Sequence, residues 1–392
     1  TTKVYFSMNS KKKITVIGGG INGLCIAWKL ARETYNVELY EAEKVLSKTS
    51  SSSSKMLHGG IRYLENFQFL SVRQALQDRA LWLEIAPQYV TVNEFYVPIY
   101  KGKGRPLWKM FFGVKLYQLL AGRKSLGNSR LISSKSGEVE KLSIKRERLD
   151  GVVTYFDAQM DEQALGQYVA DKASAAGVDI YENNPIERVS ADGTCINIAG
   201  NIIQADICIN ATGPWVRSLL DASKITTKFD TEYVRGSHLM INKEWSHSFL
   251  LQAVADNRVI FVLPYKGKML LGTTEVIQSS PNNPQCSNEE MTYLINEFNE
   301  VFSDRISTSD IIETFSGIRP IIKTITSKHS PFTASREAVI ETTGKLINVW
   351  GGKWTSALSL SDKVSSFVLR RLAKDNLYDL LKTKIYGLGN HG

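Results

Sequence analysis

We predict a two-domain α/β protein from three features of the sequence: its length, its composition and one strand–helix–strand segment near its start. The chain has 392 residues, which is too long for one typical core and fits about two domains. A hydrophobic content of 43% and a charged content of 22% are ordinary for a soluble globular protein. An apolar strand pattern at 14–17 precedes a helical pattern at 21–31 and a second strand at 36–41. That alternation is typical of a parallel sheet with crossover helices.

The turn between the first strand and the helix has the spacing GxGxxG, formed by Gly18, Gly20 and Gly23. Gly18 permits a tight turn, Gly20 lets a pyrophosphate approach the backbone, and Gly23 lets the helix pack on the strand. The helix N-terminus attracts phosphates. Glu41, at the end of the second strand, is placed to accept ribose hydroxyls. The segment therefore predicts dinucleotide binding, and the alternative is a plain glycine-rich turn.

The chain after Glu41 bears on which dinucleotide is bound. Both NAD and FAD use such a unit, whereas Glu41 disfavours NADP because it would face a second phosphate. An NAD domain would usually continue with regular strand–helix units, but here residues 48–65 read KTSSSSSKMLHGGIRYLE. The serine run 50–54 alone would suggest a solvated linker. The Lys, His, Gly and Arg residues that follow it favour a loop that holds a ligand.

The cysteines and histidines do not indicate a metal centre. The four cysteines are scattered, with no CxxC, and the five histidines are spread along the chain. We therefore expect no metal, no disulfide framework and a reducing compartment. The apolar stretch after residues 11–13 is broken by glycines, so it predicts neither a signal peptide nor a transmembrane span.

Several blocks in one order carry a specific resemblance. They are GGGINGLCIA, SSSSSKMLHGGIRYLE, NATGPWV (210–216), RGSHLMI (235–241), LLGTTEV (270–276), SGIRP (316–320) and GGKWTS (351–356). Together they resemble the FAD-dependent glycerol-3-phosphate dehydrogenases of the D-amino-acid-oxidase-like flavoprotein superfamily. The resemblance covers residues 14 to about 360, the catalytic core. Longer bacterial members carry a further C-terminal helical domain, whereas here we expect one amphipathic helix at 362–382.

The resemblance implies the architecture. We expect a Rossmann-like FAD-binding domain with a parallel sheet, assembled from 8–90, 149–224 and 330–392. An antiparallel-sheet substrate domain would take 91–148 and 225–329.

The resemblance also implies FAD as the cofactor, and no Cys or His is placed for a covalent link, so we expect non-covalent binding. Serine hydroxyls and backbone N–H groups of the serine loop would contact the flavin and its pyrophosphate. The helix after GGKWTS, with Lys353, would stabilise negative charge on the reduced ring. The expected contacts are Gly18, Gly20, Asn22, Gly23, Glu41, Thr49, Ser50, Ser51, Ser54, Lys55, Leu57, His58, Gly59, Thr212, Gly213, Gly317, Gly351, Gly352, Lys353, Trp354 and Thr355.

The resemblance implies a small anionic substrate that is oxidised beside the flavin. In this family sn-glycerol 3-phosphate becomes dihydroxyacetone phosphate, with hydride passing from C2 to flavin N5 and electrons then to quinone or another acceptor. The expected substrate ligands are Arg62, Tyr63, Arg319 and Arg336, because a guanidinium fork fits a phosphate or carboxylate. The expected catalytic groups are His238, His58, Arg319 and Lys353, with His238 favoured as the base.

Two positions depart from the family pattern: Trp354 stands where Leu is common, and Glu275 where Asp is usual. Three alternatives therefore stay open. The first is a related flavoprotein that oxidises a 2-hydroxy acid, an amine or a glycerol-phosphate group on a larger carrier. The second is an NAD-dependent dehydrogenase, and the third is a membrane-surface binding protein without turnover.

The positive charge is concentrated in one block. Residues 101–148 contain 13 Lys or Arg and 3 Asp or Glu, a net +10 against +9 for the whole chain. Within it, 105–126 mixes aromatic and basic residues, which fits either a core helix or an interfacial helix on an anionic bilayer. We expect a cytoplasmic protein, peripheral on the inner face of the cytoplasmic membrane, with quinone as a partner and no nucleic acid. The oligomeric state, including a homodimer, stays open.

Overall fold

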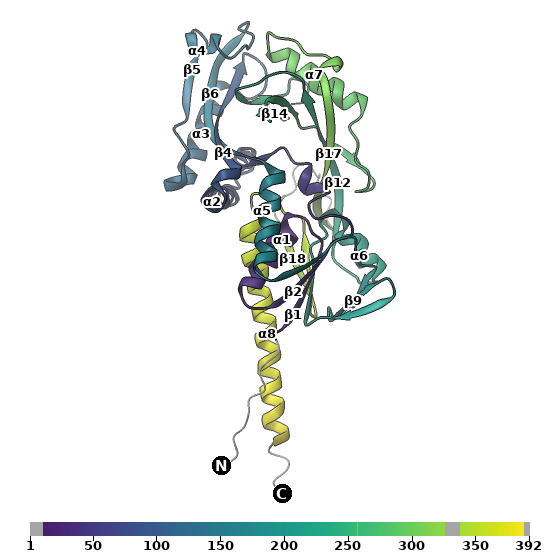
Figure 1. Ribbon diagram of the computed structural model, residues 1–392. Helices are drawn as coiled ribbons and strands as arrows, with labels where there is room; N and C mark the ends of the chain where they lie inside the picture. Colours follow the sequence, from purple (N-terminus) through teal and green to yellow (C-terminus); the bar gives the residue numbers. More distant parts are fainter. Residues whose placement is uncertain (1–10, 257, 326–337, 388–392) are drawn as a thin grey trace. The chain divides into compact units, whose positions relative to one another are not determined.

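The protein is described by a computed structural model that covers residues 11–256, 258–325 and 338–387, with side chains as far as residue 373 (Figure 1). It divides into two compact units. The first unit is Thr1–Ser47, Gly166–Thr231 and Ile322–Gly392, and the second unit is Lys48–Leu165 and Glu232–Ile321. Parallel and antiparallel sheets are both present, so the predicted α/β fold class is confirmed.

The first unit is built on a six-stranded sheet in the order β18-β19-β11-β1-β2-β7. Neighbouring strands are parallel except for the edge pair β18–β19. The strands are β1 (Lys13–Ile17), β2 (Asn36–Tyr40), β7 (Val178–Tyr181), β11 (Ile207–Asn210), β18 (Val339–Thr343) and β19 (Leu346–Trp350). A separate three-stranded sheet contains β8 (Arg188–Val189), β9 (Cys195–Ile198) and β10 (Asn201–Gln204), and α6 (Val216–Ala222) follows β11.

Two helices of the first unit pack together, α1 (Ile21–Arg32) and α8 (Ala357–Gly387). The side chains that α8 buries recur at helical spacing, at Ala357, Leu360, Val364 and Val368. The contact also has a polar edge, where Lys29 lies 2.9 Å from Asp362. Figure 1 draws α8 as the long yellow helix; it extends beyond the predicted 362–382 at both ends.

The second unit contains a ten-stranded sheet in the order β16-β12-β15-β14-β13-β4-β6-β3, with β17 on β12 and β5 on β6. The pair β13–β4 is parallel, whereas β12–β15, β12–β16, β13–β14, β14–β15, β3–β6, β4–β6 and β5–β6 are antiparallel. The strands are β3 (Met56–Leu57), β4 (Val90–Tyr100), β5 (Arg130–Ser133), β6 (Leu149–Met160), β12 (Phe229–Ile241), β13 (Ser248–Gln252), β14 (Val259–Tyr265), β15 (Lys268–Gly272), β16 (Val276–Gln278) and β17 (Ile311–Thr324). The helices are α2 (Phe69–Ile85), α3 (Leu107–Ala121), α4 (Gly137–Glu140) and α7 (Asn288–Val301). Helix α5 (Glu162–Ala175) begins in this unit, and its residues from Gly166 onward belong to the first unit.

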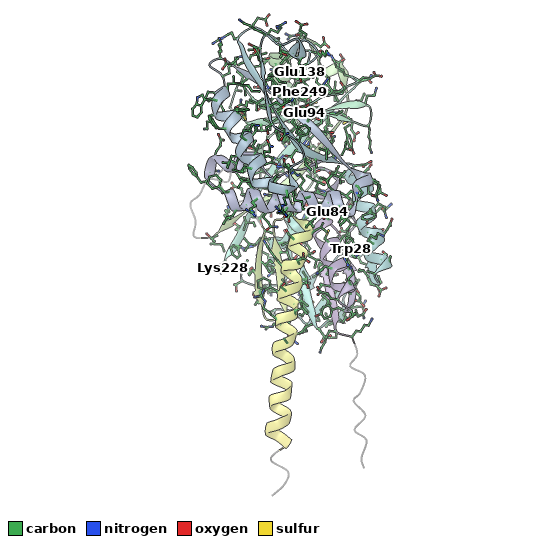
Figure 2. The ribbon with its side chains drawn as sticks, turned by 90° about the vertical axis from the view of Figure 1, so that its left-hand side faces the viewer. Trp28, Glu84, Glu94, Glu138, Lys228 and Phe249 are labelled. Carbon is green, nitrogen blue, oxygen red and sulfur yellow. The ribbon has the colours of Figure 1, made fainter. Side chains whose placement is uncertain are left out.

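Both faces of this sheet are buried. On β13, Phe249 (labelled in Figure 2) and Leu251 join a cluster with Phe298 of α7. The residue between them, Leu250, joins the opposite cluster, which contains Val114 of α3. Alternation along the strand thus supplies two cores at once.

The unit boundaries differ from the expected domains. We expected 48–90 and 149–165 in the FAD-binding domain, but both lie in the second unit. The cause is β6, which pairs with β4 along the length of both strands and with β3 inside the serine-loop segment. These long ladders hold the serine loop to the antiparallel sheet.

Candidate active site

The glycine-rich turn of the first unit leaves no room for side chains. Gly18 has φ +106°, and a Cβ on it would lie 2.6 Å from the carbonyl oxygen of Ala211. A Cβ on Gly23 would lie 1.9 Å from the carbonyl oxygen of Gly18. The turn between β1 and α1 therefore packs backbone against backbone, which is the geometry that lets a pyrophosphate reach the helix N-terminus.

Glu41 lies where the sequence predicts it, immediately after β2. Its carboxylate accepts hydrogen bonds from the backbone N–H groups of Gly19, at 2.6 Å, and Glu43, at 3.0 Å. The parallel register pairs Ile17 with Tyr40 on one side and with Asn210 on the other. The carboxyl ends of these strands therefore meet at one edge, where open α/β sheets bind their ligands.

A second glycine turn lies against the start of α1. Gly351 and Gly352 have φ of +71° and +102°, and a Cβ on Gly352 would lie 2.4 Å from the side-chain nitrogen of Asn22. Asn22 donates to the Gly351 carbonyl at 3.5 Å. Its Oδ1 is buried and has no hydrogen-bond partner among the described residues. An unsatisfied acceptor between two glycine turns fits a bound group that supplies a donor.

The Thr212–Gly213 turn completes this edge of the sheet. Thr212 donates through its hydroxyl to Asn210 Oδ1 at 2.7 Å, and Asn210 donates to Asn348 Oδ1 at 3.1 Å. Asn348 lies in the middle of β19 and was not singled out in the sequence, because a lone Asn within an apolar strand carries no motif. Lys353, Trp354 and Thr355 lie between the second glycine turn and α8.

In the second unit, the serine loop is held by a buried ion pair. Lys55 contacts Glu162 at the start of α5 and donates to the Ser51 carbonyl at 3.1 Å. Glu162 also accepts from the hydroxyl and the backbone N–H of Ser53. Burial lowers the pKa of the Lys55 amino group and raises that of the Glu162 carboxyl, and their mutual attraction opposes both shifts. Lys55 is thus a structural cation of the loop in this unit.

His238 lies on β12 in a dry, cationic setting. Its Nε2 lies 2.9 Å from the Ser54 hydroxyl, and its ring stacks on Phe315 with centroids 4.9 Å apart. Burial holds the pKa of His238 well below its usual value, and the charges of Arg319 and Lys55 lower it further. The imidazole is therefore neutral at pH 7. Its Nδ1 is buried and has no hydrogen-bond partner among the described residues.

Three arginines surround the buried carboxylate of Glu275. The distances to its oxygens are 3.6 Å from Arg319, 3.9 Å from Arg62 and 3.9 Å from Arg258. Arg258 also donates to the Glu275 carbonyl at 2.8 Å. Arg258 is also paired with Asp256 at 3.2 Å, so this arginine cluster carries three positive charges against two negative charges. Sequence reasoning missed Arg258, which sits in a hairpin loop with no motif around it.

The turn after the serine loop carries His58, Arg62 and Tyr63. Gly60 adopts the left-handed conformation at φ +72°, and the Gly59 N–H donates to the hydroxyl of Tyr117 at 2.6 Å. Arg62, one of the three arginines of the cluster, therefore lies on the turn that follows β3.

The structure gathers the predicted residues into two sets, one in each unit. The first unit brings together Gly18, Gly20, Asn22, Gly23, Glu41, Thr212, Gly213, Gly351, Gly352, Lys353, Trp354 and Thr355. The second unit holds Thr49, Ser50, Ser51, Ser54, Lys55, Leu57, His58, Gly59, Arg62, Tyr63, His238, Gly317 and Arg319. Within it Leu57 is fully buried in β3, and Gly317 allows the Ser52 carbonyl to come close, since a Cβ there would lie 2.5 Å from that oxygen. Arg336 lies outside the described residues.

Comparison with known proteins identifies the family. The profile of the DAO family, described as FAD dependent oxidoreductase, matches residues 13–355. The chain belongs to this family. It is accordingly an FAD-dependent oxidoreductase, and the NAD alternative is set aside.

Curated members of the family include dehydrogenases of phosphorylated polyols. D-erythritol 1-phosphate dehydrogenase of Brucella abortus is 33% identical over 365 residues, covering 89% of this chain and 72% of the relative. Aerobic glycerol-3-phosphate dehydrogenase of Escherichia coli is 31% identical over 369 residues, covering 90% of this chain and 72% of the relative. The predicted resemblance to glycerol-3-phosphate dehydrogenases is confirmed.

Solved structures support the fold. Glycerol-3-phosphate dehydrogenase from Bacillus halodurans, complexed with FAD, superposes at a TM-score of 0.73 with 21% identity, covering 93% of this chain and 66% of that one. Glycine oxidase from Geobacillus kaustophilus superposes at 0.71 with 17% identity, covering 92% of this chain and 96% of that one. The fold is thus shared by proteins that are named for phosphorylated and for amino substrates, so the fold alone does not choose between them.

Two further observations concern membranes and metals. Among the helices that the structure describes, none is long and apolar enough to span a bilayer. Among all of the residues that the structure describes, no group of three or more His, Cys, Asp or Glu side chains could hold a metal ion.

Proposed function

We propose that this oxidoreductase dehydrogenates a phosphorylated polyol, with sn-glycerol 3-phosphate as the substrate and dihydroxyacetone phosphate as the product. The observation that carries the proposal is the arginine cluster. Three guanidinium groups face two carboxylates, Glu275 and Asp256, so the cluster keeps a net positive charge. Guanidinium groups bind phosphate oxygens in bidentate geometry, and relatives about 30% identical to this chain are dehydrogenases of phosphorylated polyols.

The residues of this chain supply binding and proton transfer. The first unit would hold FAD at the glycine turns and Glu41, with Asn22 Oδ1 as an acceptor. When bound, FAD supplies the hydride acceptor. In the second unit, Arg62 and Arg319 would bind the phosphate, with Tyr63 beside them.

His238 is the proposed base. Its neutral state leaves one ring nitrogen with a lone pair. In the tautomer where Nε2–H donates to the Ser54 hydroxyl, that lone pair is on Nδ1, the atom with no partner among the described residues. Nδ1 would therefore take the proton of the substrate C2 hydroxyl. His58 is the second proposed base, and Lys353 would stabilise charge on the reduced flavin.

The test is an anaerobic titration of the purified yellow protein. We expect sn-glycerol 3-phosphate to bleach the long-wavelength flavin band, D-erythritol 1-phosphate to serve as the second phosphorylated substrate, and glycine to leave the band unchanged. Arg319→Ala should raise the concentration for half-bleaching about 10- to 100-fold, because it removes charge-assisted hydrogen bonds to phosphate. The matched control is Arg130→Ala, which removes an exposed arginine paired with Glu94 and Glu138 (Figure 2). If glycine but neither phosphorylated polyol bleached the band, the proposed substrate would be wrong, and an amine would be the substrate instead.

We also propose that the second unit attaches to an anionic membrane surface and passes electrons to quinone. Helix α3 exposes Trp108, Phe112 and Leu119 by 66%, 67% and 75% of their surface. The neighbouring start of α2 exposes Leu70 by 83%. Lys109 on α3 and Arg105 just before it share the carboxylate of Glu65, which leaves one positive charge next to these apolar side chains. Aromatic and basic side chains on one helix are typical of interfacial binding, and such a site would receive a lipid-soluble acceptor.

Liposome flotation tests this attachment. The wild-type protein should bind vesicles with anionic phosphatidylglycerol at low salt and should then reduce a short-chain ubiquinone faster. Trp108→Ser/Phe112→Ser should abolish binding, whereas the control Ile202→Ser, an exposed apolar residue of β10, should not. If Trp108→Ser/Phe112→Ser and Ile202→Ser bound the vesicles equally, or if the wild type did not bind them, the proposed membrane attachment would be wrong.

A further inference from the structure

A buried polar network lies behind the turn that carries His58. It joins Arg79 of α2, Tyr117 of α3 and Asp157 of β6, all of which are at most 2% exposed. Arg79 Nη1 lies 2.9 Å from Asp157 Oδ1, and the Tyr117 hydroxyl donates to Asp157 Oδ2 at 2.8 Å. Three elements of the second unit therefore converge on one carboxylate.

Both terminal nitrogens of Arg79 also donate to backbone, whereas its Nε is buried and has no hydrogen-bond partner among the described residues. Its Nη2 donates to the Lys124 carbonyl at 3.2 Å and its Nη1 to the Phe156 carbonyl at 3.4 Å. A buried ion pair of this kind adds little net stability, because desolvation of the two charges offsets their attraction. An apolar set of similar volume would stabilise the core as well or better. Stability therefore does not account for the network, and the groups that it contacts indicate another role.

The network ends on the backbone of the turn. The Tyr117 hydroxyl donates a hydrogen bond to Asp157, and its oxygen accepts one from the N–H of Gly59 at 2.6 Å. Gly59 leaves the space that this approach needs, since a Cβ there would lie 2.7 Å from both the Tyr117 hydroxyl and Leu76. Burial and the charge of Asp157 raise the pKa of Tyr117 well above its usual value, so the phenol keeps its proton.

The hydrogen bond between Gly59 and Tyr117 lies within the turn His58–Tyr63, which carries proposed site residues. His58 precedes Gly59, and Gly60 turns the chain in the left-handed conformation before Arg62 and Tyr63. Arg62 reaches Glu275 from this turn, at 3.9 Å. A shift at Gly59 would therefore displace both a proposed base and a proposed phosphate ligand.

We propose that Tyr117 is a positioning residue, held by the Asp157–Arg79 ion pair, that fixes the turn His58–Tyr63 for oxidation of the substrate. The hydroxyl is the only part of the side chain that this role requires; the ring serves the apolar core. The positioning role rests on the proposed function for its effect on rate, but the hydrogen bond itself can be tested without a substrate.

The experiment compares Tyr117→Phe with Tyr100→Phe, both as FAD-loaded enzymes. Tyr100 is the matched control, because its hydroxyl also donates inside the second unit, to the Lys145 and Val301 carbonyls at 2.9 and 3.2 Å. Amide hydrogen exchange of the peptide 56–66 should rise about tenfold in Tyr117→Phe and stay unchanged in Tyr100→Phe. The limiting rate of anaerobic flavin bleaching should fall on the order of 10- to 100-fold only in Tyr117→Phe, since small misplacements of reacting groups have large effects.

The outcomes separate the two claims. If neither sn-glycerol 3-phosphate nor D-erythritol 1-phosphate bleaches the wild type, the proposed function fails, and the exchange of peptide 56–66 alone decides whether Tyr117 fixes the turn. If exchange and bleaching rate are the same in Tyr117→Phe and the wild type, the positioning role is overturned. Equal losses in both tyrosine variants would also overturn it. Should Tyr117→Phe lose FAD, the exchange of peptide 56–66 is compared between the apoproteins of the wild type, Tyr117→Phe and Tyr100→Phe, and equal exchange in all three would overturn the positioning role.

Discussion

The two units hold their predicted site residues in different ways. In the first unit the site consists of backbone turns at the ends of parallel strands, where glycines admit no Cβ. In the second unit it consists of side chains from distant segments: Lys55 and Glu162 are 107 residues apart, and Ser54 and His238 are 184 apart. The first kind of site is specified by sheet topology and local sequence. The second depends on pairs of charges and hydrogen bonds in a dry interior, so single side chains should matter more there.

The sharpest way to break this comparison is to remove one partner of the ion pair that holds the serine loop. Lys55→Met leaves the Glu162 carboxylate buried without its cation. We expect the free energy of unfolding, measured by urea denaturation, to fall by about 3–5 kcal/mol. Lys55→Met/Glu162→Gln should regain part of that loss, because no buried charge remains.

The matched control is Lys12→Met in the first unit, which removes an exposed lysine 3.1 Å from Asp206. It should cost less than about 1 kcal/mol, because water screens exposed pairs. If Lys55→Met and Lys12→Met cost the same, the second unit does not depend on its buried charges as we argue.

A second prediction sharpens the other side of the comparison. Gly23→Ala places a methyl group where the Gly18 carbonyl lies, so α1 must move away from β1. We expect the free energy of unfolding to fall by about 1–3 kcal/mol. We also expect FAD to bind more weakly, as measured by a fluorescence titration of the apoprotein. Gly113→Ala is the control, since it is also a helical glycine but has open space at its Cβ. A Gly23→Ala protein with wild-type affinity for FAD would show that the backbone contact is not needed.

The sequence is more informative about the first unit than about the second, because the residues of the first unit are close together in the chain and those of the second are far apart. The GxGxxG turn and Glu41 lie within one strand–helix–strand segment, so their spacing alone places them together. Arg258 and Glu162 could not be predicted, because nothing near them in the chain signals the partners they meet in the fold. The expected domain boundary at residue 90 differs from the division into compact units, because β3 and β4 both pair with β6. Arg62, Arg319 and His238 were located only through the family resemblance.

The smallest predicted effect concerns the pH dependence of stability and isolates His238. The groups that face its ring are Ser54 and Phe315, and the charges that lower its pKa are those of Arg319 and Lys55. Because the pKa is lowered in the folded state, only the unfolded chain takes up a proton at this residue as the pH falls below about 6.5. Between roughly pH 6.5 and 5.5, the unfolding free energy of the wild type should therefore decrease by about 1 kcal/mol more than that of His238→Gln.

Urea denaturation of the two apoproteins at several pH values measures this difference. Above about pH 7.5 the imidazole is neutral in both states, so the two curves should run parallel there. Parallel curves through pH 5.5 as well would mean that folded His238 takes up its proton as readily as it does in the unfolded chain. That result would contradict the dry, cationic setting on which its role as a neutral base depends. A divergence that begins near pH 6.5 would instead place the base in its proton-accepting state throughout the physiological range, so substrate binding, rather than pH, would set when it acts.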